Sequence, residues 1–216
     1  MLLGLAAGVS LPAAVTLTFA EKSGKPTVDG KPAGQSNRYE LATFGGGCFW
    51  CTEAVFRELK GVRTVVSGYS GGKIPNPSYK AVLTGYSGHA EVVQINYDPD
   101  VISYTELLEV FWKTHNPTTP NRQSIDVGTQ YRSVIFYHNE QQQEIAKHYK
   151  ERLDKSKAFR APIVTIITPL AAFYRAENYH QNFYQRNRFK RYCRRVISPE
   201  LAKFRRVFRD KLKTAK

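Results

Sequence analysis

The glycine-rich stretch GGGCFWCTE, residues 45–53, is the feature that most constrains this chain. Residues 39–44 before it have the pattern of a short strand, and residues 52–59 after it have the pattern of a helix. Cys48 is therefore predicted to lie where a tight turn enters a helix N-terminus. The free amides and the dipole at a helix start stabilise an anion such as a thiolate. Consecutive glycines also leave room for a ligand to approach the backbone closely.

Two large aromatic side chains, Phe49 and Trp50, follow the cysteine directly. They place apolar surface beside the sulfur, and aromatic rings tolerate sulfur and methyl groups well. We interpret Cys48 as a nucleophile that faces a small, partly apolar, sulfur-containing group.

Cys48 and Cys51 form a Cys-x-x-Cys pattern that has other uses. A buried cysteine often serves packing alone, and these nine residues do not exclude that. A structural zinc site needs two more ligands, and neither Cys193 nor the five histidines supply a second close-spaced pair. A thiol–disulfide oxidoreductase also carries this motif at a helix start, so it stays the main alternative.

The N-terminal region predicts export. Residues 1–20 carry no charge, are rich in Leu and Val, and end in Thr-Phe-Ala, as an apolar secretory signal with a small-residue cleavage site does. The basic n-region of such a signal is missing, so an uncleaved anchor is the alternative. Residues 21–38 are rich in Lys, Gly, Pro and Ser and are predicted to be a flexible linker. We expect a periplasmic protein, with the cytoplasm as the alternative location.

The positive charge is concentrated at the other end of the chain. Residues 186–216 hold 13 Lys or Arg against two acidic residues, which is +11 of the net +14. Residues 204–216 are predicted to form a basic helical tail that contacts an anionic surface. No specific nucleic acid is expected as a partner, because export would separate the two.

Between these ends, strand and helix patterns alternate over a chain long enough for one domain. Several links are too short for parallel crossovers. The predicted class is α+β, a two-layer sandwich with a mixed β-sheet (an α/β plait with a ferredoxin-like core). Strands are expected at residues 62–69, 91–97, 134–137 and 163–168, and helices at residues 79–83, 104–114 and 139–159.

Two polar stretches are open to more than one interpretation. Glu91 begins a strand row whose other members, Val93, Ile95 and Tyr97, are apolar. It lies either at an exposed strand end or buried as a carboxyl with a raised pKa that can give a proton. Residues 126–133 form a loop that leads into a strand, either a binding loop or an ordinary tight turn.

Several separated motifs together resemble the peptide methionine sulfoxide reductases of the A type. The resemblance covers residues 39–203, which we take as the catalytic domain. One such motif would be weak evidence, but the ordered set is specific. The motifs are GCFW (47–50), GYSGG (68–72), NPSY (76–79), GHAE (88–91), GTQYRS (128–133) and YHQ (179–181).

The resemblance implies thiol-dependent repair of oxidised proteins. Cys48 matches the nucleophile that attacks the sulfur of a methionine S-sulfoxide, peptidyl or free, and Glu91 matches the acid that protonates its oxygen. The residues implied to hold the substrate are Tyr79 and Tyr131 on the oxygen, Asp126 in ordering the pocket, and Phe49 and Trp50 around the methyl group.

The resemblance also implies how the enzyme is recycled. Cys48 becomes a sulfenic acid, a second cysteine condenses with it, and thioredoxin or a thioredoxin-like domain reduces the disulfide. Cys51, one helical turn away, is slightly favoured over Cys193 as this second cysteine. The segment after Cys193 has none of the glycines that would let Cys193 move to Cys48. A relay between Cys51 and Cys193 is the further alternative. No metal, no bound cofactor and a monomer are implied.

Overall fold

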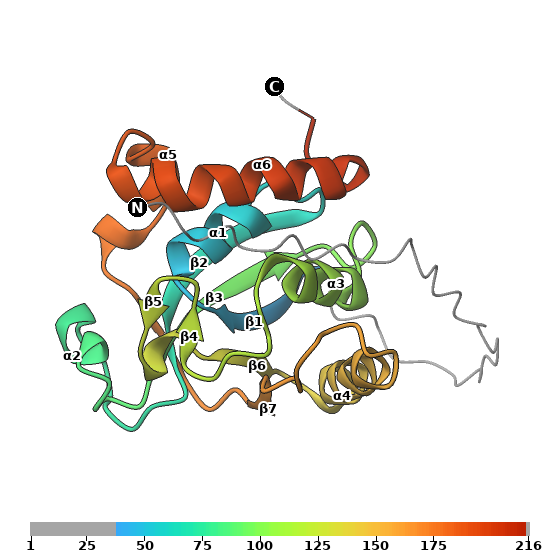
Figure 1. Cartoon of the computed structure of the whole chain (residues 1–216), viewed down its shortest axis with the longest axis horizontal. Helices are drawn as coiled ribbons and strands as arrows, with labels where there is room; N and C mark the ends of the chain where they lie inside the picture. Colours follow the sequence, from blue (N-terminus) through green and yellow to red (C-terminus); the bar gives the residue numbers. More distant parts are fainter. Residues whose placement is uncertain (1–37, 215–216) are drawn as a thin grey trace, which may run out of the picture. The chain divides into compact units, whose positions relative to one another are not determined.

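A computed structural model describes residues 38–214 of this chain (Figure 1). The predicted signal or anchor and nearly all of the predicted linker lie outside the described residues. Among residues 38–214, none of the helices is both long and apolar enough to cross a membrane.

A six-stranded sheet forms the centre of the fold. Its order is β7-β6-β1-β3-β2-β8, and only the β6–β7 pair is parallel, so the sheet is mixed. The strands are β1 (Glu40–Gly46), β2 (Val62–Ser70), β3 (Ala90–Tyr97), β6 (Ser133–Tyr137), β7 (Ile166–Pro169) and β8 (Phe173–Arg175).

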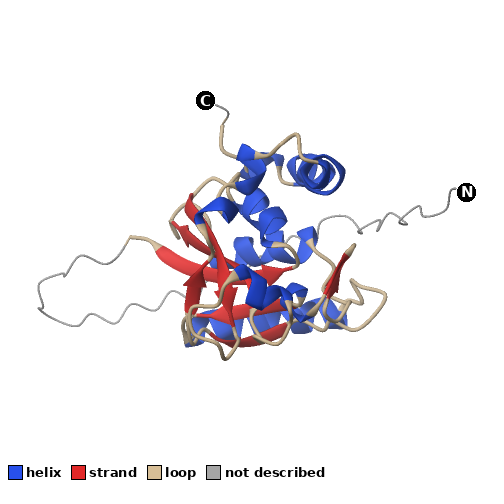
Figure 2. Ribbon diagram, turned by 90° about the vertical axis from the view of Figure 1, so that its left-hand side faces the viewer, coloured by secondary structure: helices blue, strands red, loops and turns tan. Residues whose placement is uncertain are grey.

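Three helices build the main core against one face of this sheet. They are α1 (Phe49–Phe56), α3 (Tyr104–Thr114) and α4 (Glu140–Lys155). Figure 2 shows the curved sheet in red with the helices against it. A smaller cluster on the other face is covered by Leu170 and Phe173, which belong to the β7–β8 region and not to a helix.

The α+β class with a mixed sheet is confirmed. The elements β1, α1, β2, β3, α3 and β6 follow the order β-α-β-β-α-β, apart from the short α2 (Tyr79–Leu83) and a small ribbon. The sheet continues beyond these four strands at both edges. The more specific ferredoxin-like description therefore stays a prediction.

Local sequence explains where the helices begin. Ser103 and Glu106 form a reciprocal capping box at α3, and Asn139 accepts a hydrogen bond from the Gln142 N–H at the start of α4. In β3, Val93, Ile95 and Tyr97 belong to the main core, as the two-residue period predicts.

The C-terminal region differs from its prediction in two respects. A π-helical turn, Cys193–Ile197, runs directly into α6 (Ser198–Val207), so the helix begins before the predicted helical tail of residues 204–216. The boundary expected after residue 203 falls inside α6, whose Phe204 is buried in the main core. The strand expected at residues 163–168 begins later, at Ile166, and is the edge strand β7.

Candidate active site

Cys48 occupies the position that the sequence predicts. It is the N-cap of α1, with φ −58° and ψ 123°, and only 7% of it is exposed. Its carbonyl accepts hydrogen bonds from the amides of Cys51 at 3.1 Å and Thr52 at 3.3 Å. Gly47 before it has φ +99°, a conformation that side chains rarely adopt. The turn therefore directs Cys48 onto the start of the helix, where the dipole favours an anion.

Glu91 is a buried carboxyl beside this turn. It is 1% exposed, and its Oε2 accepts a hydrogen bond from the Phe49 N–H at 3.0 Å. Burial raises the pKa of Glu91 to about 8, and the nearby charge of Asp126 adds to the effect. Of the two interpretations of the strand row, the exposed end is wrong. At neutral pH the group is mainly a neutral acid that can give a proton.

Two phenol hydroxyls approach the same place. Burial raises the pKa of Tyr79 and of Tyr131, and the charges of Glu91, Cys48 and Asp126 raise each of them further. Both hydroxyls therefore stay protonated and can donate hydrogen bonds. Tyr79 begins α2, and Tyr131 ends the 3-10 turn Thr129–Tyr131. Segments far apart in the chain thus bring hydroxyl donors to one acid and one thiol.

An aromatic wall stands beside the thiol. The Phe49 ring is fully buried and stacks on Tyr79 with ring centroids 6.4 Å apart. Trp50 stacks flat on Phe183 with centroids 3.7 Å apart, and its Nε1 donates a hydrogen bond to His180 Nδ1 at 3.0 Å. Phe49 and Trp50, the two residues predicted to form the wall, both lie in this cluster. Phe183 holds the face of the Trp50 ring, and His180 holds its edge.

Glu177 is a residue that the sequence does not single out. Its Oε1 accepts a hydrogen bond from the Tyr79 N–H at 2.8 Å, and its Oε2 accepts one from the Tyr69 hydroxyl at 2.9 Å. The same Oε2 lies 3.8 Å from His180 Nε2. Glu177 thereby connects the start of α2 to the histidine that holds Trp50. The three-residue spacing between Glu177 and His180 is the only sequence signal for this, and it is weak.

The motifs in the sequence do not indicate the structural roles of two further residues, Glu53 and Tyr192. Glu53, 1% exposed, accepts a hydrogen bond from the Asn182 N–H at 2.9 Å and so ties α1 to α5 (Phe183–Arg186). The Tyr192 hydroxyl donates a hydrogen bond to Asp126 Oδ2 at 2.7 Å. Asp126 lies in the ribbon of β4 (Arg122–Gln123) and β5 (Asp126–Val127), so Tyr192 fixes that ribbon to the C-terminal region.

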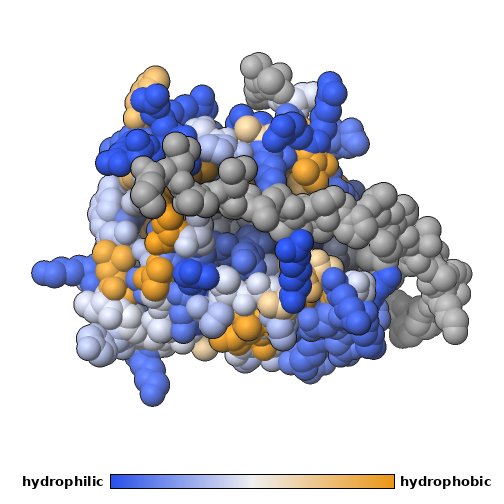
Figure 3. Space-filling view, in the orientation of Figure 1, coloured by the Kyte–Doolittle hydropathy of each residue, from blue (hydrophilic) through white to orange (hydrophobic). Residues whose placement is uncertain are grey.

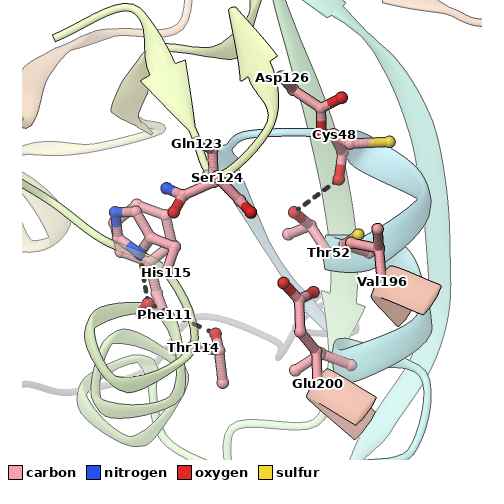
Figure 4. A pocket seen from close by; sticks show the side chains of 13 residues that line it. Cys48, Thr52, Phe111, Thr114, His115, Gln123, Ser124, Asp126, Val196 and Glu200 are labelled. Carbon is pink, nitrogen blue, oxygen red and sulfur yellow. Dashed lines mark hydrogen bonds between the residues drawn. The ribbon is translucent and has the colours of Figure 1, made fainter. Parts of the chain in front are cut away.

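A second set of side chains surrounds the cysteine pair. Cys48, Cys51, Thr52, Asp126 and Glu200 line one pocket (Figure 4). The Cys51 sulfur lies 3.8 Å from the Tyr192 hydroxyl. Its hydrogen bond to the Cys48 thiol and its burial raise the pKa of Cys51 well above the usual value.

Cys193 lies in the π-helical turn and is fully buried. Burial raises the pKa of its thiol, and the charge of Cys48 adds to this rise. All three cysteines are free thiols. Within the described residues, no group of three or more His, Cys, Asp or Glu is arranged to hold a metal ion.

The fold places a cysteine at a helix start, with a buried acid bound to the next backbone amide, and this arrangement is typical of a thiol-dependent oxidoreductase. A family model described as peptide methionine sulfoxide reductase matches residues 40–212. The chain belongs to this family, and both the family and the enzyme class predicted from the motifs are confirmed.

Relatives of the A type span most of the chain. The peptide methionine sulfoxide reductase MsrA of Sulfolobus acidocaldarius is 55% identical over 176 residues, which cover 80% of this chain and 97% of the relative. MsrA 1 of Rhodopirellula baltica is 56% identical over 174 residues, covering 81% and 90%. Among solved structures, the reduced form of Mxr1 from Saccharomyces cerevisiae is similar, with a TM-score of 0.66, 38% identity, and coverage of 72% of this chain and 90% of that one. Methionine sulfoxide reductase A of Corynebacterium diphtheriae has a TM-score of 0.64, with 36% identity and coverage of 72% and 78%.

Proposed function

We propose that this enzyme reduces the S-sulfoxide of L-methionine, in oxidised proteins and as the free amino acid, with Cys48 as nucleophile and Glu91 as proton donor. One observation carries the proposal. A carboxyl that is 1% exposed and has a pKa of about 8 is bonded to the amide next to the candidate nucleophile. A protonated acid at that place is what sulfoxide reduction requires.

The chemistry follows from the sulfoxide bond. Its oxygen leaves sulfur only when protonated, so an acid must face the thiolate across the substrate. As Cys48 attacks the sulfur, Glu91 gives its proton to the oxygen, and the hydroxyls of Tyr79 and Tyr131 donate hydrogen bonds to it. Phe49 and Trp50 surround the methyl group, and Asp126 orders the pocket through Tyr192. Methionine leaves, and Cys48 remains as a sulfenic acid.

Cys51 is the thiol we propose to resolve this sulfenic acid. It lines the same pocket as Cys48, and its backbone N–H donates a hydrogen bond to the Cys48 carbonyl at 3.1 Å. Cys193 is buried in a helical turn continuous with α6, which favours a later role in relaying the disulfide. Two thiols supply the two electrons that the sulfoxide takes, and water leaves, so the reaction needs no bound cofactor. An external dithiol such as thioredoxin or a thioredoxin-like domain restores the thiols.

Thiol counting by mass spectrometry tests this scheme. The wild type and the variants Cys51→Ser and Cys193→Ser are each treated with excess methionine S-sulfoxide and no reductant. The wild type should release methionine and lose two thiols, and Cys51→Ser should stop at the sulfenic acid. Absence of methionine with unchanged thiols would overturn the reductase proposal. A sulfenic acid that accumulates in Cys193→Ser instead would reverse the two cysteine roles.

A thiol–disulfide oxidoreductase is the second candidate, favoured by the Cys-x-x-Cys pair at the start of α1. It makes no use of Glu91, Tyr79 or Tyr131. Turnover of a protein disulfide without sulfoxide, unaffected by Glu91→Gln, would support it.

The proposed setting is the periplasm, with residues 1–20 as signal or anchor. The catalytic domain begins near residue 39, acts as a monomer and includes α6 with its basic side chains. Figure 3 shows hydrophilic side chains along the upper edge of the molecule, interspersed with apolar ones. Lys203, Arg205 and Arg206 on α6 and Arg209 just after it are exposed, which supports contact with an anionic surface. Cell fractionation with the mass of the mature chain tests export, and retention on anionic vesicles tests the contact.

A further inference from the structure

One carboxylate beside the cysteine pair has no part in the scheme above. Glu200 lies in the first turn of α6 and lines the same pocket as Cys48 and Cys51. Figure 4 shows it reaching from α6 into this pocket toward Thr52. Cys51 and Glu200 thus line one pocket together, and the charge of Glu200 acts on the Cys51 thiol. A carboxylate next to a thiol that must lose a proton has the placement of a general base.

Cys51 needs such a base because it holds its proton firmly. The hydrogen bond to Cys48, burial, and the negative charge of Glu200 all raise the pKa of Cys51. Only the thiolate attacks a sulfenic sulfur effectively. The proton therefore has to leave Cys51 during the attack, and an acceptor must already be in place.

Three titratable groups face Cys51, namely Cys48, Tyr192 and Glu200. Cys48 carries the sulfur under attack. The Tyr192 hydroxyl lies 3.8 Å away and donates a hydrogen bond to Asp126. Burial and the neighbouring thiols raise its pKa strongly, so it does not ionise. Glu200 is the one of the three that can take the proton directly.

The charges around Glu200 allow it to hold a proton briefly. Burial and the charge of Asp126 raise its pKa, while the Cys51 thiol and Lys203 oppose the rise. A carboxyl whose pKa is raised accepts a proton more readily than an ordinary one and can return it afterwards.

We propose that Glu200 accepts the proton of Cys51 as its sulfur attacks the Cys48 sulfenic acid, and returns it to the departing oxygen. The S–S bond forms as the S–O bond of Cys48 breaks, and the hydroxide that leaves takes the proton and departs as water. Cys51 is oxidised and the sulfenic sulfur is reduced, so electrons balance without another reactant. The inference rests on the proposed function and adds a catalytic base to its second step.

The experiment separates the two chemical steps in the full chain. In a Cys193→Ser background, single-turnover reactions with methionine S-sulfoxide are sampled for released methionine and for sulfenic acid trapped by a dimedone-type probe. Glu200→Gln should release methionine at a rate within about twofold of the parent, while the sulfenic acid should persist about 10- to 100-fold longer. Glu200→Asp should restore part of the rate. Glu144→Gln, an exposed glutamate on α4, is the matched control and should behave as the parent.

The pH profile adds a readout that a purely structural role would not change. In the parent, disulfide formation should quicken as Glu200 ionises with rising pH, and Glu200→Gln should lose that dependence. Equal sulfenic lifetimes in the parent and Glu200→Gln would overturn the inference, as would a delay seen in Tyr192→Phe but not in Glu200→Gln. Loss of methionine release in the parent itself would instead refute the proposed function.

Discussion

The Oε2 atom of Glu91 accepts a hydrogen bond from the backbone N–H of Phe49 at 3.0 Å, across 42 residues of sequence. This contact joins strand β3 to the first turn of α1, directly beside Cys48. The first turn of α1, which follows Cys48, therefore holds the Glu91 carboxyl in place, and strand β3 in turn fixes the start of that helix. Because the bond favours the ionised carboxylate, burial must outweigh it to keep the pKa near 8.

Replacing Glu91 by glutamine should remove the proton that the sulfoxide needs and leave the surrounding hydrogen bonds in place. We expect Glu91→Gln to release methionine about 10²- to 10⁴-fold more slowly, because the amide can still accept the Phe49 bond but cannot protonate the sulfoxide. In the wild type the rate of this step should fall as pH rises above about 8, as Glu91 ionises. The variant should lack that alkaline decline. Single-turnover methionine release from pH 6 to 10 measures both.

Glu53→Gln is the matched control for this experiment, since Glu53 is equally buried but binds the Asn182 amide. It should keep the alkaline decline. An unchanged rate in Glu91→Gln would assign the proton to another donor.

The same carboxyl should make stability depend on pH. Its pKa is about 8 when folded and about 4.5 when unfolded, so the folded state binds the proton more tightly. Its stabilising contribution is complete below pH 4.5 and is lost as pH rises toward 8. Relative to Glu91→Gln, the wild type should lose up to about 3 kcal/mol of unfolding free energy between pH 4.5 and 7. Urea unfolding of both proteins at several pH values, with the thiols reduced, gives this difference; parallel curves would contradict it.

The sequence predicts the centre of this site well because the signals there are local. Three glycines before an apolar helix pattern place Cys48 at a helix start. The alternation of β3 places Glu91 in one row with apolar residues but leaves its own burial open, which the structure decides. The capping box at Ser103 is likewise decided by residues within one turn. Each of these depends on backbone geometry that adjacent residues determine.

The supporting network is not predictable in the same way. Trp50 and His180 are 130 residues apart, and Tyr79 and Glu177 are 98 apart. Nothing in either segment indicates its partner, because the pairing depends on strand order in the sheet. The role of Tyr192 is equally unpredictable from the sequence, because its contact with Asp126 forms only when the C-terminal region packs against the β4–β5 ribbon.

The turn before Cys48 should tolerate no side chain at Gly47. Its φ is +99°, and a Cβ there would lie 2.6 Å from the side chain of Gln123. Gly47→Ala should lower the unfolding free energy by about 2–3 kcal/mol, from backbone strain and from displacing Gln123. Because Gln123 pairs with Asp126 in the ribbon, methionine release should slow as well. Thermal unfolding and single-turnover assays measure the two effects.

Gly88→Ala separates the effect of backbone strain from the effect of displacing Gln123. Gly88 also has a positive φ, +74°, but a Cβ there would meet nothing closer than 3.4 Å. It should lose only about 1 kcal/mol. Equal losses at the two positions would show that the contact with Gln123 is unimportant.

The end of the chain should behave as part of the catalytic fold and not as a separable tail. Phe204 is 3% exposed in the main core, whereas Val207 on the same helix is 57% exposed. Phe204→Ala should lower the unfolding free energy by about 3–5 kcal/mol, and Val207→Ala should change it by less than about 0.5 kcal/mol. Urea unfolding of the two variants measures the contrast. If Phe204→Ala were as mild as Val207→Ala, residues 204–216 would be an independent tail, and the boundary predicted after residue 203 would stand.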